Sequence, residues 1–203
     1  LNLFRFYIGR KHNLKNFEFS QSYFMFWDKL EKANYFLECI IDSAAEDWNS
    51  RMVMHLLSNP IEDGGQWDMW VSLIDKYGVI PQSEMSESFS SSQSSTMNRM
   101  IARKLRENAK DLRQNISKGV SGDDLETIKT DMLEQIYKML TMHIGIPPTS
   151  FNWQTYDKKK NFISFENLTP KSFFDDHVGL NLDEYVCLIN CPMEDKEYRK
   201  VYT

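Results

Sequence analysis

The chain has 203 residues, and its 24 Lys and Arg against 29 Asp and Glu give a formal net charge of −5. This balance provides no general electrostatic attraction to nucleic acid or to an anionic membrane, and no apolar run is long enough to span a bilayer. Because Cys39, Cys187 and Cys191 show neither disulfide-framework nor zinc spacing, we expect no metal, no cofactor and a reducing, cytoplasmic location.

Helical patterns dominate residues 1–82. Ser20 is a good N-cap for a long helix whose apolar positions nearly encircle it, so this helix should be packed on several sides. Pro60 follows a shorter helix that it cannot continue, and Gly78 stands where the C-terminal cap of the next helix belongs. Helices are therefore expected over residues 1–11, 20–43, 51–58 and 67–77.

A serine-rich stretch over 83–96 separates this region from a second helical unit. With eight serines between Ser83 and Ser95, its composition is typical of a flexible linker. Beyond it, apolar residues recur at helical spacing in two stripes, and the turn residues around Gly119 lie between them. We therefore expect a pair of antiparallel helices with apolar stripes over 97–116 and 125–143.

The last part of the chain is expected to contain a few short strands. Residues 151–165 have a strand-like pattern interrupted by a charged turn, and 185–190 form an apolar run short enough for a buried strand. Between them, Pro170 opens a short helix that should continue through His177 and close at Gly179. The predicted fold class is therefore mainly α, with α+β character near the C-terminal end.

The adjacent glycines Gly64 and Gly65 are the main candidate for a binding site. Because they lack Cβ atoms, another backbone can lie against theirs, and strained dihedral angles cost them little. A helix that carries Trp67 follows at once. A tight turn before a helix would use the same two glycines, and Trp67 could equally be a core residue.

Three segments have an order and spacing that closely resemble one peptidase family. They are 17–27 with the sequence FEFSQSYFMFW, 59–69 with NPIEDGGQWDM, and 76–81 with KYGVIP. Together they resemble the bleomycin hydrolase and aminopeptidase C family of papain-like cysteine peptidases. Leu1 and Asn2 also resemble the end of that family's Cys-Trp-x-Phe-(Ala/Ser)-x-Leu-Asn motif, which implies a central fragment starting about six residues after the catalytic cysteine.

The resemblance implies a thiol aminopeptidase that hydrolyses peptide bonds through a Cys-His-Asn site. In papain-like peptidases, a Gly-Gly step at this place pairs its backbone with the extended peptide substrate, like an added strand. The serine-rich stretch and the helical pair match the family's large insertion, which helps to assemble a homohexamer. Asp63 is a candidate for recognising the free amine of a substrate. The implied substrate-binding residues are Asp63, Gly64, Gly65, Gln66 and Trp67.

None of the cysteines or histidines has the sequence context of a catalytic group. Cys39 falls within an apolar helix, Cys187 lies in an apolar run, and Cys191 has neither a helix N-terminus nor a His beside it. Each of the four histidines is expected to be a structural or surface residue, and the family's catalytic His and Asn come far later in a longer chain. We therefore expect no catalytic residue here and no hydrolysis by this segment alone.

The resemblance also implies a domain organisation. It assigns the helical lobe of a papain-like peptidase to 1–82, the serine-rich connection to 83–96, the helical insertion to 97–180, and the start of the β lobe to 181–203. The stripes rich in Met and Ile fit an assembly insertion and equally fit two helices that only cover a core. An autonomous, non-enzymatic helical module for protein interaction is the alternative to the enzyme. An encoded Cys-Trp just before residue 1 would decide for the enzyme.

Overall fold

The computed structural model describes residues 1–185, 193–195 and 197–200. This part of the chain is mainly helical, with one two-stranded sheet, which confirms the predicted fold class. The elements in chain order are α1 (Asn2–Lys11), α2 (Gln21–Asp42), α3 (Arg51–Ser58), α4 (Trp67–Tyr77), α5 (Phe89–Ser92), α6 (Ser95–Ser117), α7 (Gly122–Ile144), β1 (Phe151–Tyr156), β2 (Phe162–Leu168), α8 (Pro170–Phe173), the π-helix η1 (Phe174–Val178) and the 3-10 helix η2 (Leu182–Glu184).

Local side-chain chemistry defines where several of the helices begin and end. The Ser20 hydroxyl accepts a hydrogen bond from the backbone N–H of Tyr23 at 3.0 Å, so it caps α2 as predicted. Ser50 caps α3 in the same way, through the N–H of Val53. Gly78 ends α4 with φ +71° and ψ −156°, a backbone conformation essentially restricted to glycine.

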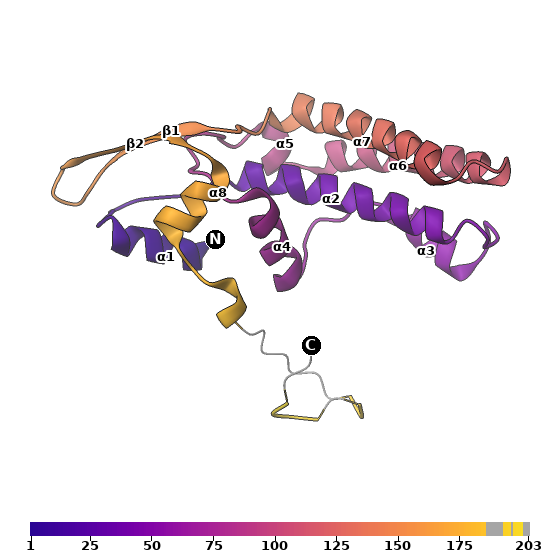
Figure 1. Cartoon of the computed structure of the whole chain (residues 1–203), viewed down its shortest axis with the longest axis horizontal. Coiled ribbons are helices and arrows are strands. Elements are labelled where there is room, and N and C mark those ends of the chain that lie inside the picture. Colours follow the sequence, from indigo (N-terminus) through magenta and orange to yellow (C-terminus); the bar gives the residue numbers. More distant parts are fainter. Residues whose placement is uncertain (186–192, 196, 201–203) are drawn as a thin grey trace.

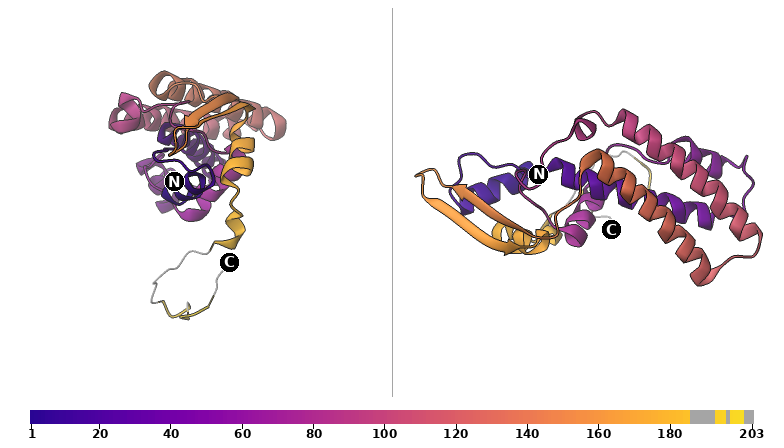
Figure 2. Two further views of the ribbon diagram at one scale, coloured as in Figure 1. Left: turned by 90° about the vertical axis from the view of Figure 1, so that its left-hand side faces the viewer. Right: turned by 90° about the horizontal axis from the view of Figure 1, so that it is seen from above.

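The helices α6 and α7 form an antiparallel pair that lies along α2 (Figures 1 and 2). Each of the three helices contributes fully buried apolar side chains to the interface, because its apolar residues recur at helical spacing. One cluster of buried side chains continues from this interface to α1 and the β-hairpin. Its members at the three-helix interface include Leu37, Ile40, Ile101, Leu105, Leu112, Ile136 and Leu140.

At the opposite end of the molecule, β1 and β2 pair as an antiparallel hairpin (Figure 1). Phe151 and Trp153 alternate with exposed residues along β1, and both are buried. The ring of Phe173, from α8, lies 5.1 Å from that of Trp153, so the hairpin is packed on the α8 segment. On α1, Phe4 and Ile8 are fully buried, and Phe4 meets the ring of Trp70 on α4 at 4.7 Å.

The serine-rich stretch is more ordered than its composition indicated. Ser88 and Ser91 form a reciprocal capping box around the short helix α5, and the Ser88 hydroxyl also donates to the carbonyl of His143 at 3.0 Å. Serine composition suits linkers and helix caps alike, and here the hydroxyls act as caps. The interpretation as a flexible linker is therefore wrong for residues 88–94.

Two further expectations near the C-terminal end have different outcomes. Thr169 and Ser172 cap α8, but the expected single helix changes into the π-helix η1 after Phe173, and Gly179 then closes it in the left-handed conformation. The strand expected over 185–190 lies largely outside the described residues, as do Cys187 and Cys191. In the part of the chain that the structure describes, no helix has both the length and the apolar character needed to cross a membrane.

Candidate functional site

A surface hollow of about 600 Å³ opens beside the start of α4. Its walls come from Leu1 at the beginning of α1, from Asp28 on α2, from the loop before α4, and from Ser94 before α6. The residues predicted from the sequence all line it, namely Asp63, Gly64, Gly65, Gln66 and Trp67. The loop that carries the glycine pair therefore lies at an open groove and next to the beginning of α1.

The backbone of the two glycines is accessible from solvent. Gly64 has φ +102°, and a Cβ atom placed there would meet no heavy atom within 4 Å. A Cβ at Gly65 would have only the flexible thioether of Met69 nearby, with Sδ at 3.6 Å. Within residues 1–185, no hydrogen bond engages the N–H or the C=O of Gly65. An exposed donor and acceptor on one residue are what an added strand requires.

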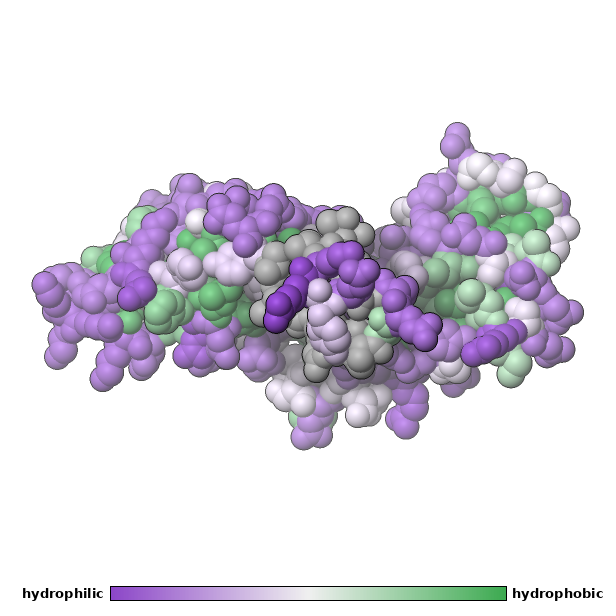
Figure 3. Space-filling view, turned by 90° about the horizontal axis from the view of Figure 1, so that it is seen from below, coloured by the Kyte–Doolittle hydropathy of each residue, from purple (hydrophilic) through white to green (hydrophobic). Residues whose placement is uncertain are grey.

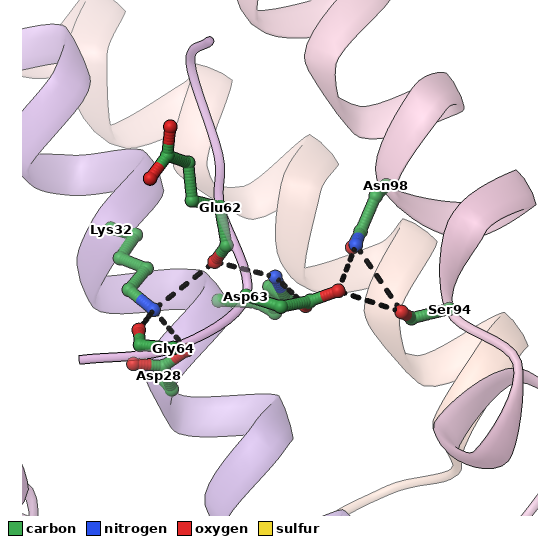
Figure 4. Close-up of polar contacts among 8 residues, drawn as sticks. Asp28, Lys32, Glu62, Asp63, Gly64, Ser94 and Asn98 are labelled. Carbon is green, nitrogen blue, oxygen red and sulfur yellow. Dashed lines mark hydrogen bonds and ion pairs between the residues drawn. The ribbon is translucent and has the colours of Figure 1, made fainter.

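The side chain of Asp63 is engaged by the protein itself (Figure 4). Its Oδ1 accepts from Lys29 Nζ at 2.5 Å, and its Oδ2 accepts from the Ser94 hydroxyl at 2.9 Å and from the Asn98 amide at 3.0 Å. Burial alone would raise the pKa of this carboxyl, but these hydrogen bonds and the Lys29 charge together hold the pKa below its usual value. Asp63 thus accepts three hydrogen bonds from the protein, and its side chain remains 54% exposed.

Trp67 combines the two roles considered for it. Its ring lies 5.1 Å from that of Trp70, which in turn contacts the buried Phe4, so one side of Trp67 joins the core. The indole is nevertheless only half-buried and forms part of the hollow, where Tyr185 approaches it with ring centroids 6.0 Å apart. Trp67 can therefore offer an apolar wall while remaining fixed in position.

No pair of a cysteine and a histidine lines the hollow among residues 1–185. Cys39 is half-buried on α2, ten positions beyond Lys29 and thus about 15 Å further along the helix. His55 is exposed on α3, and His143 lies within 3.2 Å of the Ser90 hydroxyl. The same described residues contain no cluster of three groups that could hold a metal ion.

The remaining histidines form a contact that the sequence did not indicate. His12 Nε2 and His177 Nδ1 lie 3.2 Å apart beside the rings of Trp153 and Phe165. Burial is the main cause that lowers the pKa of His12 to about 4, and repulsion from Lys11, and from His177 when it is protonated, adds to it. Burial likewise lowers the pKa of His177. A pair of neutral rings therefore joins α1 to η1, and it lies outside the hollow.

Sequence reasoning also missed the two lysines that lie under residues 62–66, the segment called the glycine loop from here on. Lys29 is fully buried on α2, and Lys32 lies one helical turn further along the same face. The available signal was the position of Lys29 on a helix whose apolar residues nearly encircle it. A lysine in such a position needs a fixed partner, because an unpaired buried charge is strongly unfavourable.

Known proteins resemble this chain over its whole length. The model of the Peptidase C1-like family matches residues 1–203. Aminopeptidase C of Listeria monocytogenes is 44% identical over 203 residues, and bleomycin hydrolase of Homo sapiens is 38% identical over 207 residues. Both matches cover 100% of this chain but only 45% and 46% of those proteins, so the chain spans about half their length.

A solved structure is similar over almost the whole chain. The crystal structure of PepW from Lactobacillus rhamnosis matches with a TM-score of 0.95 and 44% sequence identity. The match covers 98% of this chain and 44% of the PepW chain. At this identity, the similarity extends beyond the general fold to the arrangement of individual elements.

Proposed function

This chain belongs to the Peptidase C1-like family, and from that premise we propose that it forms the substrate-binding wall of a cysteine-type aminopeptidase. Relatives that match its full length are named aminopeptidase C and bleomycin hydrolase. In the proposed reaction, a Cys-His-Asn site hydrolyses the peptide bond next to the first residue of a peptide. This chain contributes to that reaction by holding the peptide.

The observation that carries the proposal is the free backbone of Gly65. Its N–H and C=O are exposed in the hollow, and no described residue hydrogen-bonds to them. An extended peptide laid along the loop would satisfy both groups and would gain their hydrogen bonds in return. Trp67 and Met69 offer apolar surface beside that peptide, while the Gly64 position leaves room for its backbone.

We further propose that the Cys-His-Asn site lies outside the described residues of this chain. The support is that Cys39 lies far along α2 and that the four histidines lie away from the hollow. On this proposal, the isolated 203-residue chain binds peptides but does not hydrolyse aminoacyl-coumarin substrates. Thiol-dependent turnover by that chain, persisting through stringent purification, would contradict this part of the proposal.

The substitution Gly65→Ala tests the binding role. Its Cβ has only Met69 as a close neighbour, so the fold should tolerate it, whereas the added methyl group narrows the backbone edge that a peptide would use. In the intact protein, we expect KM for a short peptide to rise about 5- to 10-fold, the loss of roughly one hydrogen bond. Steady-state kinetics of the purified protein measure this change.

Gly9→Ala is the matched control, because Gly9 lies on α1, where a Cβ has space and no substrate contact is proposed. We expect KM to stay within about twofold of the parent for this variant. If Gly65→Ala also left KM unchanged while the protein remained folded, the glycine loop would not bind substrate.

The proposal extends to a homo-oligomer, a homohexamer by family resemblance, in the cytoplasm. Apolar side chains gather over α1 and over α3 on the face seen from below (Figure 3). Among the exposed apolar side chains of α1 and α3 are Phe6, which is 57% exposed, and Met52, which is 59% exposed. Exposed apolar groups of this kind are typical of contact surfaces. Sedimentation of the intact protein as a monomer at all concentrations would contradict the oligomer.

A further inference from the structure

Two lysines on one face of α2 bind three successive residues of the glycine loop. Lys29 Nζ donates to the carbonyl of Glu62 at 2.8 Å and to the carboxylate of Asp63 at 2.5 Å. Lys32 Nζ donates to the same Glu62 carbonyl at 3.1 Å and also to the carbonyl of Gly64. The loop carbonyls are thus held on the α2 side, which leaves the backbone groups of Gly65 free.

The opposite side of the loop is attached to α6 (Figure 4). Ser94 precedes α6, and Asn98 lies one turn along it, so both side chains reach the second oxygen of Asp63. The Asn98 amide also donates to the Ser94 hydroxyl at 3.3 Å. Asp63 therefore connects two helices that are separated by more than fifty residues in the sequence.

The loop has few other contacts that could hold it in place. Residues 62–66 are all exposed, and Gly64 and Gly65 have no side chains that could anchor the backbone. By contrast, the Lys29 side chain is only 1% exposed, and its ammonium group would be strongly destabilised if Asp63 moved away. The lysine therefore restricts the loop to positions in which the ion pair is formed.

We propose that Lys29 and Asp63 are positioning residues for substrate binding, and that Ser94 and Asn98 make the position of the glycine loop depend on α6. This inference rests on the proposed function, because it assumes that the loop binds the peptide. It assigns a task to the helical pair α6–α7 that is separate from covering the core. A shift of α6 along its axis would move Asp63, and with it the backbone edge offered to substrate.

The double substitution Ser94→Ala/Asn98→Ala removes the attachment to α6 but keeps the Lys29–Asp63 pair. Both residues are half-buried near the N-terminal end of α6 and belong to none of its buried apolar positions, so the fold should persist. We expect exchange of the Trp70 amide, which donates to the Gln66 carbonyl at 3.2 Å and whose exchange we call loop exchange, to become about 10-fold faster, because the loop opens more often. In the intact protein, KM for a short peptide should rise about 5-fold, with kcat within about twofold of the parent.

Asn115→Ala/Ser117→Ala is the matched control at the other end of α6. There the same two residue types make only local hydrogen bonds, to the carbonyls of Asp111 and Gln114. Neither loop exchange nor KM should change in this variant. Ser94→Thr keeps a hydroxyl in place and should behave like the parent, a rescue that general destabilisation of α6 would not produce.

The ion pair itself needs a variant that does not leave a buried charge alone. Lys29→Met/Asp63→Asn removes both charges at similar side-chain size, and such replacements are often tolerated. We expect this protein to fold, with loop exchange and KM raised at least as much as in the α6 variant. Unchanged exchange and KM in both double variants would overturn the inference.

These experiments separate the inference from the function on which it rests. If Gly65→Ala raises KM while both double variants match the parent, the loop binds substrate but Lys29 and Asp63 do not position it. Faster loop exchange in the double variants with an unchanged KM also overturns their role in substrate binding. If Gly65→Ala itself leaves KM unchanged, the proposed function fails independently of the attachment to α6.

Discussion

Helix α4 is flanked by glycines at both ends, and these glycines differ in how closely other atoms approach them. At its N-terminal end, Gly64 and Gly65 are exposed, and a Cβ at Gly64 would meet nothing within 4 Å. At its C-terminal end, a Cβ on Gly78 would lie 2.3 Å from the carbonyl carbon and oxygen of Pro170. One end keeps the backbone open to solvent, and the other lets two backbones touch inside the protein. The same residue type thus serves access at one end and packing at the other.

The contacts around each end follow the same division. At the packed end, the N–H of Val79 donates to the Pro170 carbonyl at 3.1 Å, and the ring of Tyr77 stacks on Trp27 with centroids 3.9 Å apart. At the open end, the side chains of Lys29 and Lys32 hold the backbone carbonyls of Glu62 and Gly64. Packing fixes the first end rigidly, whereas polar attachments fix the second and leave Gly65 available.

The substitution Gly78→Ala should produce the largest effect on stability. The new methyl group would overlap the Pro170 backbone, and Gly78 has dihedral angles that other residues rarely adopt. We expect the free energy of unfolding to fall by about 3 kcal/mol or more. Urea unfolding followed by tryptophan fluorescence measures the change, and failure to accumulate as folded protein would agree with it.

Gly119→Ala provides the control that separates dihedral strain from overlap. Gly119 has φ +89°, but a Cβ there meets no atom within 4 Å. We expect this variant to lose only about 1 kcal/mol of unfolding free energy. If Gly78→Ala and Gly119→Ala lost similar amounts of unfolding free energy, the overlap with Pro170 would contribute nothing to the effect of Gly78→Ala.

The contrast between the ends of α4 shows what the sequence can predict about the fold. The helix itself and its cap at Gly78 were predicted within a residue, because helical periodicity and glycine caps are local signals. The contact of Gly78 with Pro170 joins positions more than ninety residues apart, and no local pattern predicts it. The change from α8 to the π-helix η1 was missed as well, because the sequence pattern predicted one continuous helix.

The site shows the same limit. The exposed glycines and their neighbours were predicted, because a Gly-Gly step before a Trp-bearing helix is visible in the sequence, and the family resemblance gave it a role. The attachment of Asp63 to Lys29 and Asn98 was missed, since it depends on three segments meeting in space. The pairing of Asp63 was therefore not foreseen when it was named as a candidate for recognising the amine of a substrate.

As the pH falls, the contribution of the packed end to folding stability should be lost at a higher pH than that of the open end. Segment α8–η1, which contacts Gly78, carries His177 beside His12, and the pKa of His12 is lowered to about 4. The folded state therefore favours neutral His12, so its stability is complete above about pH 6.5 and is lost as pH falls toward 4. Because His12 is only partly buried, we expect this loss to be about 1 kcal/mol.

Asp63, at the open end, loses its contribution to folding stability in a lower pH range than His12. Its pKa is lowered by its partners, so its contribution is present above its unfolded pKa of about 3.8 and is lost only below that. Urea unfolding at pH 7 and pH 5 should therefore report mainly on the packed end. His12→Phe should reduce the difference between the two pH values, whereas His55→Gln, at an exposed position, should leave it intact. An equal pH difference in His12→Phe would exclude His12 as its source.

The smallest effects on stability are expected at the open end itself. Gly64→Ala should lose about 1 kcal/mol of unfolding free energy, because its φ of +102° is unfavourable although space is available. Gly65 does not have a left-handed φ, and its Cβ would make only an ordinary contact with Met69. Gly65→Ala should therefore be neutral or stabilising by up to about 0.5 kcal/mol, since alanine restricts the unfolded chain.

Measured together, the stability of Gly65→Ala should equal or slightly exceed that of the parent, while its peptide binding should become weaker. Unfolding in urea should show a protein as stable as the parent, while peptide kinetics should show weaker binding. This combination is expected where a residue is kept for access rather than for packing. If Gly65→Ala instead lost as much stability as Gly78→Ala, both ends of α4 would be packed. A rise in KM would then reflect a distorted fold, and it could not be assigned to a peptide lying along the glycine loop.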